Sequence, residues 1–222
     1  MRNVLSKTSK LDGNRSWSLQ ARETCPGSKL KSGELVEACS GCYATIGNYY
    51  LPDVIAVRAD NKLAWQDSGW VELMVKELDN DRYFRWFDSG DCYHIDLAHK
   101  MLEIMIRTPW CRHWFPTRMY KFAKFRAIFE LMDALPNVKV RYSSDAIDGT
   151  YDSDHGSTIV WDESQVDSDT HLCRSFEHAG KCSGCRVCWN KDVPVIAYKT
   201  HGNRMKGVVN RKKVIDIVAL AA

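Results

Sequence analysis

Tyr83-Phe-Arg-Trp-Phe87, the segment from Ile95 to Arg107, and Arg112-His-Trp-Phe115 follow one another along the chain and together decide its fold. The first and third are short and aromatic, and Asp88-Ser-Gly-Asp91 closes the first, as is typical of strands and the turns that end them. The middle segment repeats apolar residues near helical spacing, at Leu97, Met101, Leu102, Ile104 and Met105. The pattern predicts a strand, a helix and a second strand, in that order.

The same alternation continues on both sides of this stretch. Helices are predicted at residues 69–78 and 122–135, and further strands at residues 17–19, 138–142, 158–161 and 193–198. Strands that alternate with helices form a parallel sheet with the helices outside it. No Gly-rich phosphate loop of the Rossmann type follows any of these strands. We therefore predict an α/β fold, a TIM-like (β/α) barrel that is either partial or complete, with about six parallel strands.

The composition is that of a globular protein. The chain has 222 residues, of which 45% are hydrophobic and 27% are charged, and these values are typical of a protein with an ordinary core. No apolar run approaches the ~20 residues that span a bilayer. The first residues, Met1 to Thr8, lack an apolar stretch of signal-peptide length. We expect a single domain, residues 1–222, in the cytoplasm and without a membrane partner.

Nine cysteines are the strongest chemical signal in the sequence. A reducing compartment disfavours disulfides, and an odd number fits poorly with a complete disulfide framework. Seven of the cysteines fall into two cysteine-rich loops, at residues 25–42 and 173–189. The other two, Cys92 and Cys111, stand alone and are predicted to be buried, because cysteine is among the most often buried residues. The two loops point to metal or redox chemistry.

The C-terminal loop carries four cysteines in the arrangement C-x8-C-x2-C-x2-C, at Cys173, Cys182, Cys185 and Cys188. A C-x2-C-x2-C run is typical of ferredoxin-type iron–sulfur loops. Four thiolates also satisfy tetrahedral zinc, although zinc sites more often use paired C-x2-C hairpins. We predict a metal site here and favour an iron–sulfur cluster, most simply [4Fe-4S], with zinc as the alternative.

The N-terminal loop carries three cysteines, Cys25, Cys39 and Cys42. A lone C-x2-C pair also occurs in redox dithiols, but here a third cysteine lies upstream of the pair. Three thiolates would leave one iron of a four-iron cluster without a protein ligand. The sequence leaves open whether the chain holds one cluster or two. In a barrel the first and last strands are neighbours, which would bring the two loops together.

Polar residues follow several of the predicted strands. Barrel enzymes carry their chemistry at the carboxyl ends of the strands, so we expect a pocket lined by Asp88, Asp91, Arg118, Asp145 and His201. Ordinary turn chemistry explains polar residues at strand ends equally well. The sequence assigns no catalytic residue, and the partner would be an unknown small-molecule substrate or an unknown redox protein.

Charge is unevenly distributed although the net charge is only +3. Eight acidic residues and no Lys or Arg lie between Asp145 and Asp169, whereas six bases and no acid lie between Lys199 and Lys213. Two solvated faces of opposite sign explain this pattern most simply. The basic segment 199–213 is also a possible nucleic-acid contact, although it contains no recognised DNA- or RNA-binding motif.

Three motifs carry a resemblance to a known family. Cys39-Ser-Gly-Cys42-Tyr43-Ala44 after Cys25-Pro-Gly, the run Phe84 to Asp91, and the closing Cys182-x2-Cys185-x2-Cys188-Trp189 resemble the bacteriophage "gene product eighty-eight" family, which is similar to radical S-adenosylmethionine-like iron–sulfur proteins. The resemblance covers the chain from about Cys25 to His201. It implies a (β/α) barrel, an iron–sulfur cluster and, for a phage-encoded protein, the host cytoplasm.

The sequence departs from the radical-enzyme pattern at two places. Radical S-adenosylmethionine enzymes use C-x3-C-x2-C, whereas thirteen residues separate Cys25 from Cys39 here. The Gly-Gly-Glu cofactor motif of those enzymes is absent, and Ser89-Gly90-Asp91 is a distant echo of it. The resemblance therefore supports the fold and the metal more strongly than it supports the radical chemistry.

Three functions are compatible with these observations. We expect an iron–sulfur protein with a redox or electron-transfer role and one or two clusters. The alternatives are a radical S-adenosylmethionine-type enzyme and a zinc-stabilised nucleic-acid-binding protein. A single cluster shared between the loops would be closed by four of the seven thiolates, so we expect S-adenosylmethionine to bind weakly or not at all.

Overall fold

The computed structural model describes residues 5–152 and 156–220, and within them the strands form one sheet in the order β1-β2-β3-β4-β5-β6-β8-β7. β1 runs antiparallel to β2, and every other neighbouring pair in the sheet is parallel. The strands are β1 (Ser6–Lys7), β2 (Arg15–Trp17), β3 (Tyr83–Trp86), β4 (Arg112–Thr117), β5 (Val138–Ser143), β6 (Gly156–Val160), β7 (Thr170–Cys173) and β8 (Val195–Lys199).

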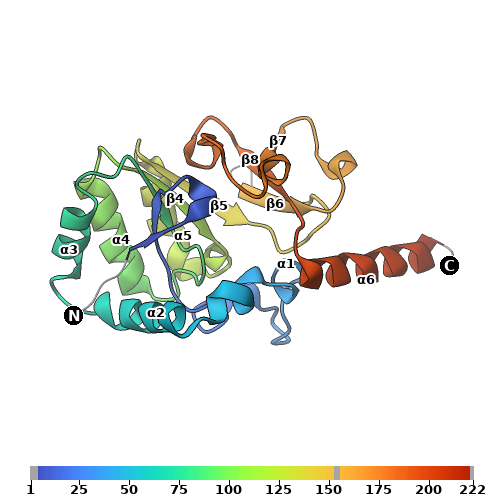
Figure 1. Ribbon diagram of the computed structural model, residues 1–222, viewed down its shortest axis with the longest axis horizontal. Helices are drawn as coiled ribbons and strands as arrows, with labels where there is room; N and C mark the ends of the chain where they lie inside the picture. Colours follow the sequence, from blue (N-terminus) through green and yellow to red (C-terminus); the bar gives the residue numbers. More distant parts are fainter. Residues whose placement is uncertain (1–4, 153–155, 221–222) are drawn as a thin grey trace.

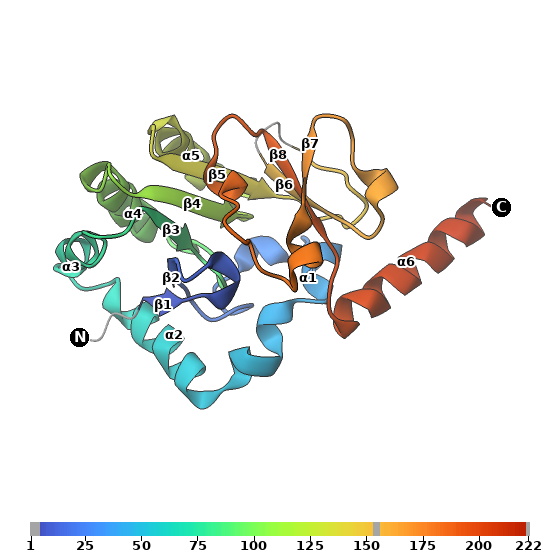
Figure 2. The ribbon, with the colours of Figure 1, turned by 45° about the horizontal axis from the view of Figure 1, so that its top comes forward.

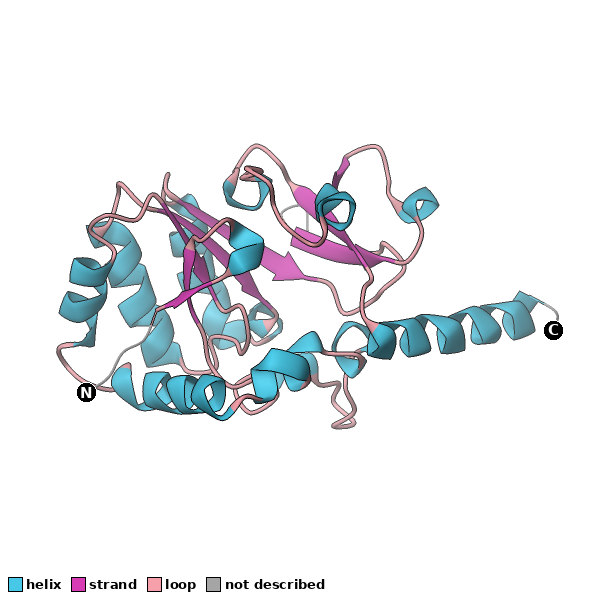
Figure 3. Cartoon of the chain, in the orientation of Figure 1, coloured by secondary structure: helices cyan, strands magenta, loops and turns pink. Residues whose placement is uncertain are grey.

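Helices are distributed unevenly over the sheet. α3, α4 and α5 cover one face of the half that contains β2 to β5, while β6, β7 and β8 extend away from them (Figure 1; Figure 2). α6 projects from the molecule at the C-terminal end, and loops and short turns take most of the connections around β6 to β8 (Figure 3). The helices are α1 (Glu37–Ser40), α2 (Pro52–Ala64), α3 (Trp70–Glu77), α4 (Ile95–Arg107), α5 (Ala123–Ala134) and α6 (Asn203–Leu220).

The main core lies between the sheet and these three helices. Phe84 and Trp86 alternate with half-buried neighbours along β3, and both point into this core. α4 places Leu97, Met101 and Ile104 on its inner face, where all three are fully buried. Each such side chain contributes roughly 1.5–3 kcal/mol through the apolar surface that it removes from water. The apolar face of β3, which repeats every two residues, and the apolar face of α4, which repeats about every 3.6 residues, therefore pack into the same core.

Two smaller clusters lie outside the main core. Leu11, Trp114 and Trp189 pack together on the sheet face opposite the helices, because Trp114 alternates with the inward-facing His113 and Phe115 along β4. The first half of α6 packs through Met205, Val208 and Val209 against Ala38 of α1 and Ile147. This second contact joins the C-terminal helix to the N-terminal cysteine loop.

The structure confirms the predicted α/β class and most of the predicted elements. The helix from Ile95 to Arg107 has the predicted bounds, and the strands that begin at Tyr83, Arg112 and Val138 are present. α1, α2, α6, β1 and β7 were not predicted. β7 could not be predicted because its sequence, Thr-His-Leu-Cys, does not alternate between apolar and polar residues, and the strand is half-exposed.

Of the predicted partial or complete barrel, only an open and mostly parallel sheet is confirmed. The sheet of the described residues stays open, with β1 and β7 at its two edges. Closure requires that the outermost strands pair with each other, and here β1 is a two-residue antiparallel strand whose register involves β2 alone. The first and last strands are therefore not neighbours, so strand pairing does not bring the two cysteine loops together.

No helix among the described residues is long and apolar enough to cross a lipid bilayer.

Candidate functional site

The N-terminal cysteine loop is seated on the carboxyl ends of β4 and β5. The amide of Ala38 donates to the carbonyl oxygen of Asp145 at 2.9 Å, just after β5 ends. Gly27 lies against Arg118, which follows β4, so closely that a Cβ atom would be 2.6 Å from the Arg118 carbonyl oxygen. Gly41 packs in the same way on the backbone of Met205 in α6. These contacts hold Cys25, Cys39 and Cys42 in one place, although thirteen residues separate the first two.

The three thiols of this loop lie close enough together to shift one another's pKa values. Burial, with smaller contributions from the nearby Asp91, Cys39 and Cys42, raises the pKa of Cys25 to about 12. Burial also raises the pKa of Cys39, with a smaller contribution from Cys42, while Arg118 opposes the rise. A thiol becomes a metal ligand only after it has lost its proton. Arg118, and to a smaller extent Lys121, therefore favour the thiolate form of Cys39.

Asp91 links the ends of β3 and β4 and lies close enough to Cys25 to act on its pKa. Its carboxylate accepts from Thr117 Oγ1 at 2.7 Å and from the Arg118 amide at 2.8 Å, and the Cys92 amide donates to it as well. Burial raises the pKa of Asp91, and the three donors oppose that rise. The main role of Asp91 that this geometry supports is to fix the position of Arg118 beside Cys39.

Arg118 and Asp145 form the polar wall of the site. Arg118 Nη2 donates to the carbonyl oxygen of Ser144 at 2.8 Å, and Arg118 Nε lies 3.4 Å from Asp145 Oδ1. Neither of these last two atoms has a well-aligned hydrogen-bond partner among the described residues, although both are buried. Lys121 Nζ binds the other carboxylate oxygen of Asp145 at 2.6 Å. Arg118 and Asp145 are therefore joined by an ion pair in which Arg118 Nε and Asp145 Oδ1 make no well-aligned hydrogen bond with each other.

Asp88 is held on the other side of the site by two tyrosines that follow Cys42. Tyr43 Oη donates to the carbonyl oxygen of Asp88 at 2.6 Å, and Tyr49 Oη donates to its Oδ1 at 2.9 Å. Phe87, immediately before it, adopts a positive φ of 53° although it is buried and is not glycine. Such backbone strain persists only where the surroundings impose it. His201 is exposed and lies 6.2 Å from Tyr43, measured between ring centroids.

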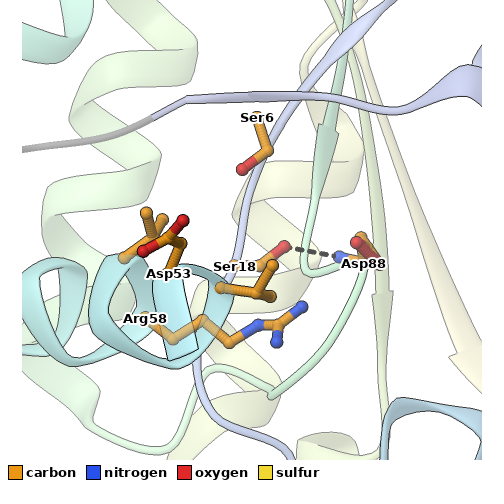
Figure 4. Close-up of a pocket in the computed structure, with 7 residues that line it drawn as sticks. Ser6, Ser18, Asp53, Arg58 and Asp88 are labelled. Atoms are coloured by element: carbon orange, nitrogen blue, oxygen red, sulfur yellow. Dashed lines mark hydrogen bonds between the residues drawn. The ribbon is translucent and has the colours of Figure 1, made fainter. Parts of the chain in front are cut away.

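A cavity of about 150 Å³ adjoins Asp88 at the carboxyl ends of β2 and β3. Figure 4 shows Arg58 reaching from α2 beneath Ser18 toward Asp88, with Asp53 and Ser6 on the remaining sides. Arg58 is only 5% exposed, its Nε has no partner among the described residues, and its guanidinium lies 4.7 Å from the Tyr49 ring centroid. The cavity thus combines one buried cation with carboxylates on its walls.

The C-terminal cysteine loop lies on the opposite side of the sheet from α3, α4 and α5. The Cys182 amide donates to the carbonyl oxygen of Lys10 at 2.8 Å, and the Gly184 amide donates to Asp12 Oδ2 at 2.9 Å. Arg186 binds the same Asp12 oxygen at 2.8 Å. The loop is therefore fastened to the turn between β1 and β2, although more than 170 positions separate Asp12 from Gly184 in the sequence.

The thiols of this second loop also shift one another's pKa values. Burial raises the pKa of Cys188 to about 11, and Cys173 and Cys182 contribute in the same direction. Burial raises the pKa of Cys182, with contributions from Cys173 and Cys185. Cys188 Sγ lies 3.3 Å from Tyr198 Oη on β8. The seven clustered cysteines therefore form the same two groups in the structure as in the sequence, since each thiol's pKa is shifted by cysteines of its own loop.

Neither group is arranged as a finished metal site. Among residues 5–152 and 156–220, no three His, Cys, Asp or Glu side chains converge on a point at which a metal ion could sit. All nine cysteines are free thiols. Cys92 and Cys111 are fully buried in the main core, as predicted.

Sequence reasoning missed several polar residues of the site. Arg58, Arg85, Tyr43 and Tyr49 surround Asp88 or lie beside it, and Arg85 stacks on the Trp114 ring at 4.5 Å. Arg58 and Tyr49 come from an unpredicted helix and the turn before it, so no strand end pointed to them. A tyrosine directly after a cysteine pair, as at Cys42-Tyr43, was the available signal for Tyr43.

The basic segment 199–213 is partly neutralised. Lys199 pairs with Glu163 at 3.0 Å, and Lys212 lies 2.8 Å from both Glu37 and Asp148. Arg204 Nη1 donates to Thr45 Oγ1. Half of the six bases are thus used inside the molecule, which weakens the interpretation of this segment as a nucleic-acid surface.

A family comparison agrees with the motifs. A family model described as gene product 88 matches residues 3–209. The chain belongs to the gene product 88 family. The match includes both cysteine loops and ends within α6. The predicted family resemblance is therefore confirmed, whereas no comparison supports the wider resemblance to radical S-adenosylmethionine proteins.

Searches of curated proteins and of solved structures returned no match.

Proposed function

We propose that this member of the gene product 88 family is an iron–sulfur protein with a redox or electron-transfer role, and that each cysteine loop binds its own cluster. The observation that carries the proposal is the gathering of seven thiols into two groups on a scaffold that otherwise keeps cysteines in its core. Three thiols lie at the strand ends, and four lie in a C-x8-C-x2-C-x2-C loop. The C-x2-C-x2-C part of that loop is the spacing typical of ferredoxin-type ligands.

The chemistry of the donor set fits such clusters. Every member of both groups is a soft sulfur donor, as iron–sulfur clusters require, and the nearest carboxylates are occupied by other partners. Cys25, Cys39 and Cys42 would hold one cluster, and Cys173, Cys182, Cys185 and Cys188 the other. A bound cluster supplies one-electron transfer.

The residues around the first group have defined tasks in this proposal. Arg118 places a positive charge beside Cys39, which favours the thiolate. Asp91 orients Arg118 through its backbone amide. Tyr43, directly after Cys42, is anchored on the carbonyl oxygen of Asp88 and restrains the end of the cysteine loop.

Iron and acid-labile sulfide content of protein purified without oxygen tests the proposal. We expect both elements, a brown colour, and a loss of about half the iron when Cys39 or Cys188 is replaced by Ser, because each variant would disable one of two clusters. Cys111→Ser is the control and should leave the iron content unchanged. Colourless protein with stoichiometric zinc would overturn the proposal in favour of the zinc alternative.

A second candidate function is a radical S-adenosylmethionine-type enzyme, which one observation favours. The three-thiol group would leave one cluster position without a cysteine, and the cavity that holds Arg58 and Asp88 lies at the same end of the sheet. The long spacing between Cys25 and Cys39 and the missing Gly-Gly-Glu motif count against it. Cofactor cleavage by the reduced protein would decide for this second function.

A further inference from the structure

Arg141 is the most completely enclosed cation in the described part of the chain. It lies on β5, its side chain is fully buried, and its guanidinium makes six hydrogen-bond contacts, all to backbone carbonyl oxygens. The acceptors belong to Gly156, Val187, Cys188, Asn190, Val193 and Pro194, at distances of 2.9 to 3.4 Å. Five of these six residues lie in the segment that carries the last cysteine of the chain and leads into β8.

The segment from Val187 to Pro194 contains a 3-10 turn of three residues, Val187–Trp189, and has no other regular structure before β8. A loop without secondary structure must satisfy its carbonyl groups in some other way if it is buried. Arg141 performs this task for five carbonyl groups of the segment, and its Nε donates to the carbonyl oxygen of Cys188 itself at 2.9 Å. The position of the Cys188 thiol is thereby tied to the central strand of the sheet.

The charge of Arg141 has no paired carboxylate. Among residues 5–152 and 156–220, no Asp or Glu oxygen lies within ion-pair distance of its guanidinium, whereas Lys139 on the same strand pairs with Asp133 at 3.7 Å. An uncompensated buried cation is strongly unfavourable. Carbonyl dipoles offset part of that cost, and the groups whose negative charge would act on Arg141 are Tyr198, Cys188 and Asp133, in that order.

We propose that Arg141 is a positioning residue that closes the segment Val187–Pro194 around Cys188 and supplies the buried positive charge opposite a metal–thiolate centre at the C-terminal cysteines. The inference rests on the proposed function for the nature of that centre, but the closure of the segment is a separate claim. A cluster bound by four thiolates carries net negative charge, so a fixed cation beside it stabilises its reduced, more negative form.

Arg141→Met removes the charge and the donors while keeping a long apolar side chain. Arg141→Lys keeps the charge but makes at most three of the six bonds. Lys139→Met is the matched control, because Lys139 is also buried, lies on the same strand and points to the same face of the sheet. Hydrogen exchange of the amides in residues 187–194, iron per chain, and the midpoint potential are measured for the wild type and these three variants. Iron retention is also measured for Cys188→Ser and for the double variant Arg141→Met/Cys188→Ser.

In Arg141→Met we expect at least a tenfold faster exchange in residues 187–194 and a 10–100-fold weaker retention of iron against a chelator. The loss should equal that of Cys188→Ser, and the double variant should lose no more, because both act on one centre. Any cluster that remains there should have a lower midpoint potential. Arg141→Lys should restore the potential but not the slow exchange, and Lys139→Met should match the wild type in all three measurements.

Unchanged exchange and unchanged iron retention in Arg141→Met would overturn the proposal. If Arg141→Met does not fold, Arg141→Lys decides, and wild-type exchange in that variant is then the contradicting result. Wild-type protein without any iron would instead overturn the proposed function, while the exchange measurement would still test the closure of the segment. An equal effect of Lys139→Met would show that any buried cation on β5 has the same role, which also contradicts the proposal.

Discussion

His113 shows how one buried side chain is fixed in both its tautomer and its charge. Trp86 Nε1 donates to His113 Nδ1 at 3.2 Å, so we assign the ring proton to Nε2, which lies 2.9 Å from Thr108 Oγ1. Thr108 Oγ1 donates its own proton to the carbonyl oxygen of Ile104. Burial lowers the pKa of His113 from 6.5 to about 3. The folded protein therefore holds a neutral ring at pH values at which the unfolded chain protonates it.

Acid should destabilise the fold through this ring. Between pH 6.5 and about pH 3 the unfolded state binds a proton that the folded state does not, so the free energy of unfolding falls as the pH decreases. From pH 7 to pH 5 the loss from His113 is about 2 kcal/mol. Urea unfolding at both pH values measures it, and His113→Gln should lose about 2 kcal/mol less than the wild type. Equal losses in the two proteins would show that the ring is not buried in its neutral form.

Gly27 is a residue for which a single methyl group decides the position of a cysteine loop. Alanine there would place its Cβ 2.6 Å from the backbone carbonyl oxygen of Arg118, which cannot move without shifting the end of β4. We expect Gly27→Ala to destabilise the protein by about 1–3 kcal/mol and to lower its iron content by loosening Cys25. Gly207→Ala is the control, because its nearest neighbour is the flexible Arg211 side chain at 3.8 Å. Wild-type iron and stability in Gly27→Ala would contradict the packing described for this loop.

At the scale of elements, the C-terminal cysteine loop depends on one aromatic anchor. Trp189 follows Cys188, is 3% exposed, and donates from Nε1 to the carbonyl oxygen of Phe84 at 2.8 Å. Its ring contacts Trp114 and Tyr83 at centroid distances of 5.3 and 5.5 Å, with steeply inclined planes. The loop is thereby attached to β3 and β4, while Arg141 attaches it to β5.

Replacing this anchor should release the loop from the sheet. Trp189→Leu is expected to destabilise the protein by about 2–3 kcal/mol, through lost packing and a lost hydrogen bond, and to weaken iron retention. Trp110→Leu is the matched control, since Trp110 also donates to a backbone carbonyl, that of Leu78 at 3.0 Å, but is 39% exposed. It should cost about 1 kcal/mol and leave the iron unchanged. Thermal unfolding and iron assays compare the two, and equal effects would argue against an anchoring role for Trp189.

At the scale of the whole molecule, the open sheet changes the argument about S-adenosylmethionine. The expectation of weak or absent binding assumed that one closed cluster is shared between the loops. Two separate groups instead leave the N-terminal cluster with one iron that no cysteine ligates, so coordination alone no longer excludes binding there. The primary proposal still expects no binding, because the Gly-Gly-Glu cofactor motif is absent, whereas the second candidate function requires binding. That expectation stays a prediction, and the grouping of the thiols makes its test informative.

Electron paramagnetic resonance of the reduced protein, with and without S-adenosylmethionine, separates the two functions. Under the primary proposal we expect no change of the signal and no cofactor cleavage. A shifted signal that Cys39→Ser abolishes and Cys188→Ser retains would establish the enzyme at the N-terminal group. A shifted signal that Cys188→Ser abolishes and Cys39→Ser retains would show instead that the cofactor binds at the C-terminal group.

The sequence by itself determined the class of the fold, its middle elements and the two cysteine groups. Periodicity is a local property, so Tyr83–Trp86 and Ile95–Arg107 could be predicted from the alternation of apolar residues alone. The run from Cys182 to Cys188 is likewise local, because its spacing is written in seven consecutive residues. The gene product 88 family was predictable for the same reason.

Only the tertiary structure decided the rest, because it depends on contacts between distant positions. Whether a parallel sheet closes is set by the pairing of its outermost strands, and the two-residue β1 carries no signal for that outcome. The cage around Arg141 joins β5 to residues 46 to 53 positions later in the chain. Arg58, Tyr49 and Asp88 meet in the same way. From the sequence alone, an arginine in a strand is expected to be exposed to solvent. Arg141 is buried because backbone carbonyl groups from distant parts of the chain accept hydrogen bonds from its guanidinium.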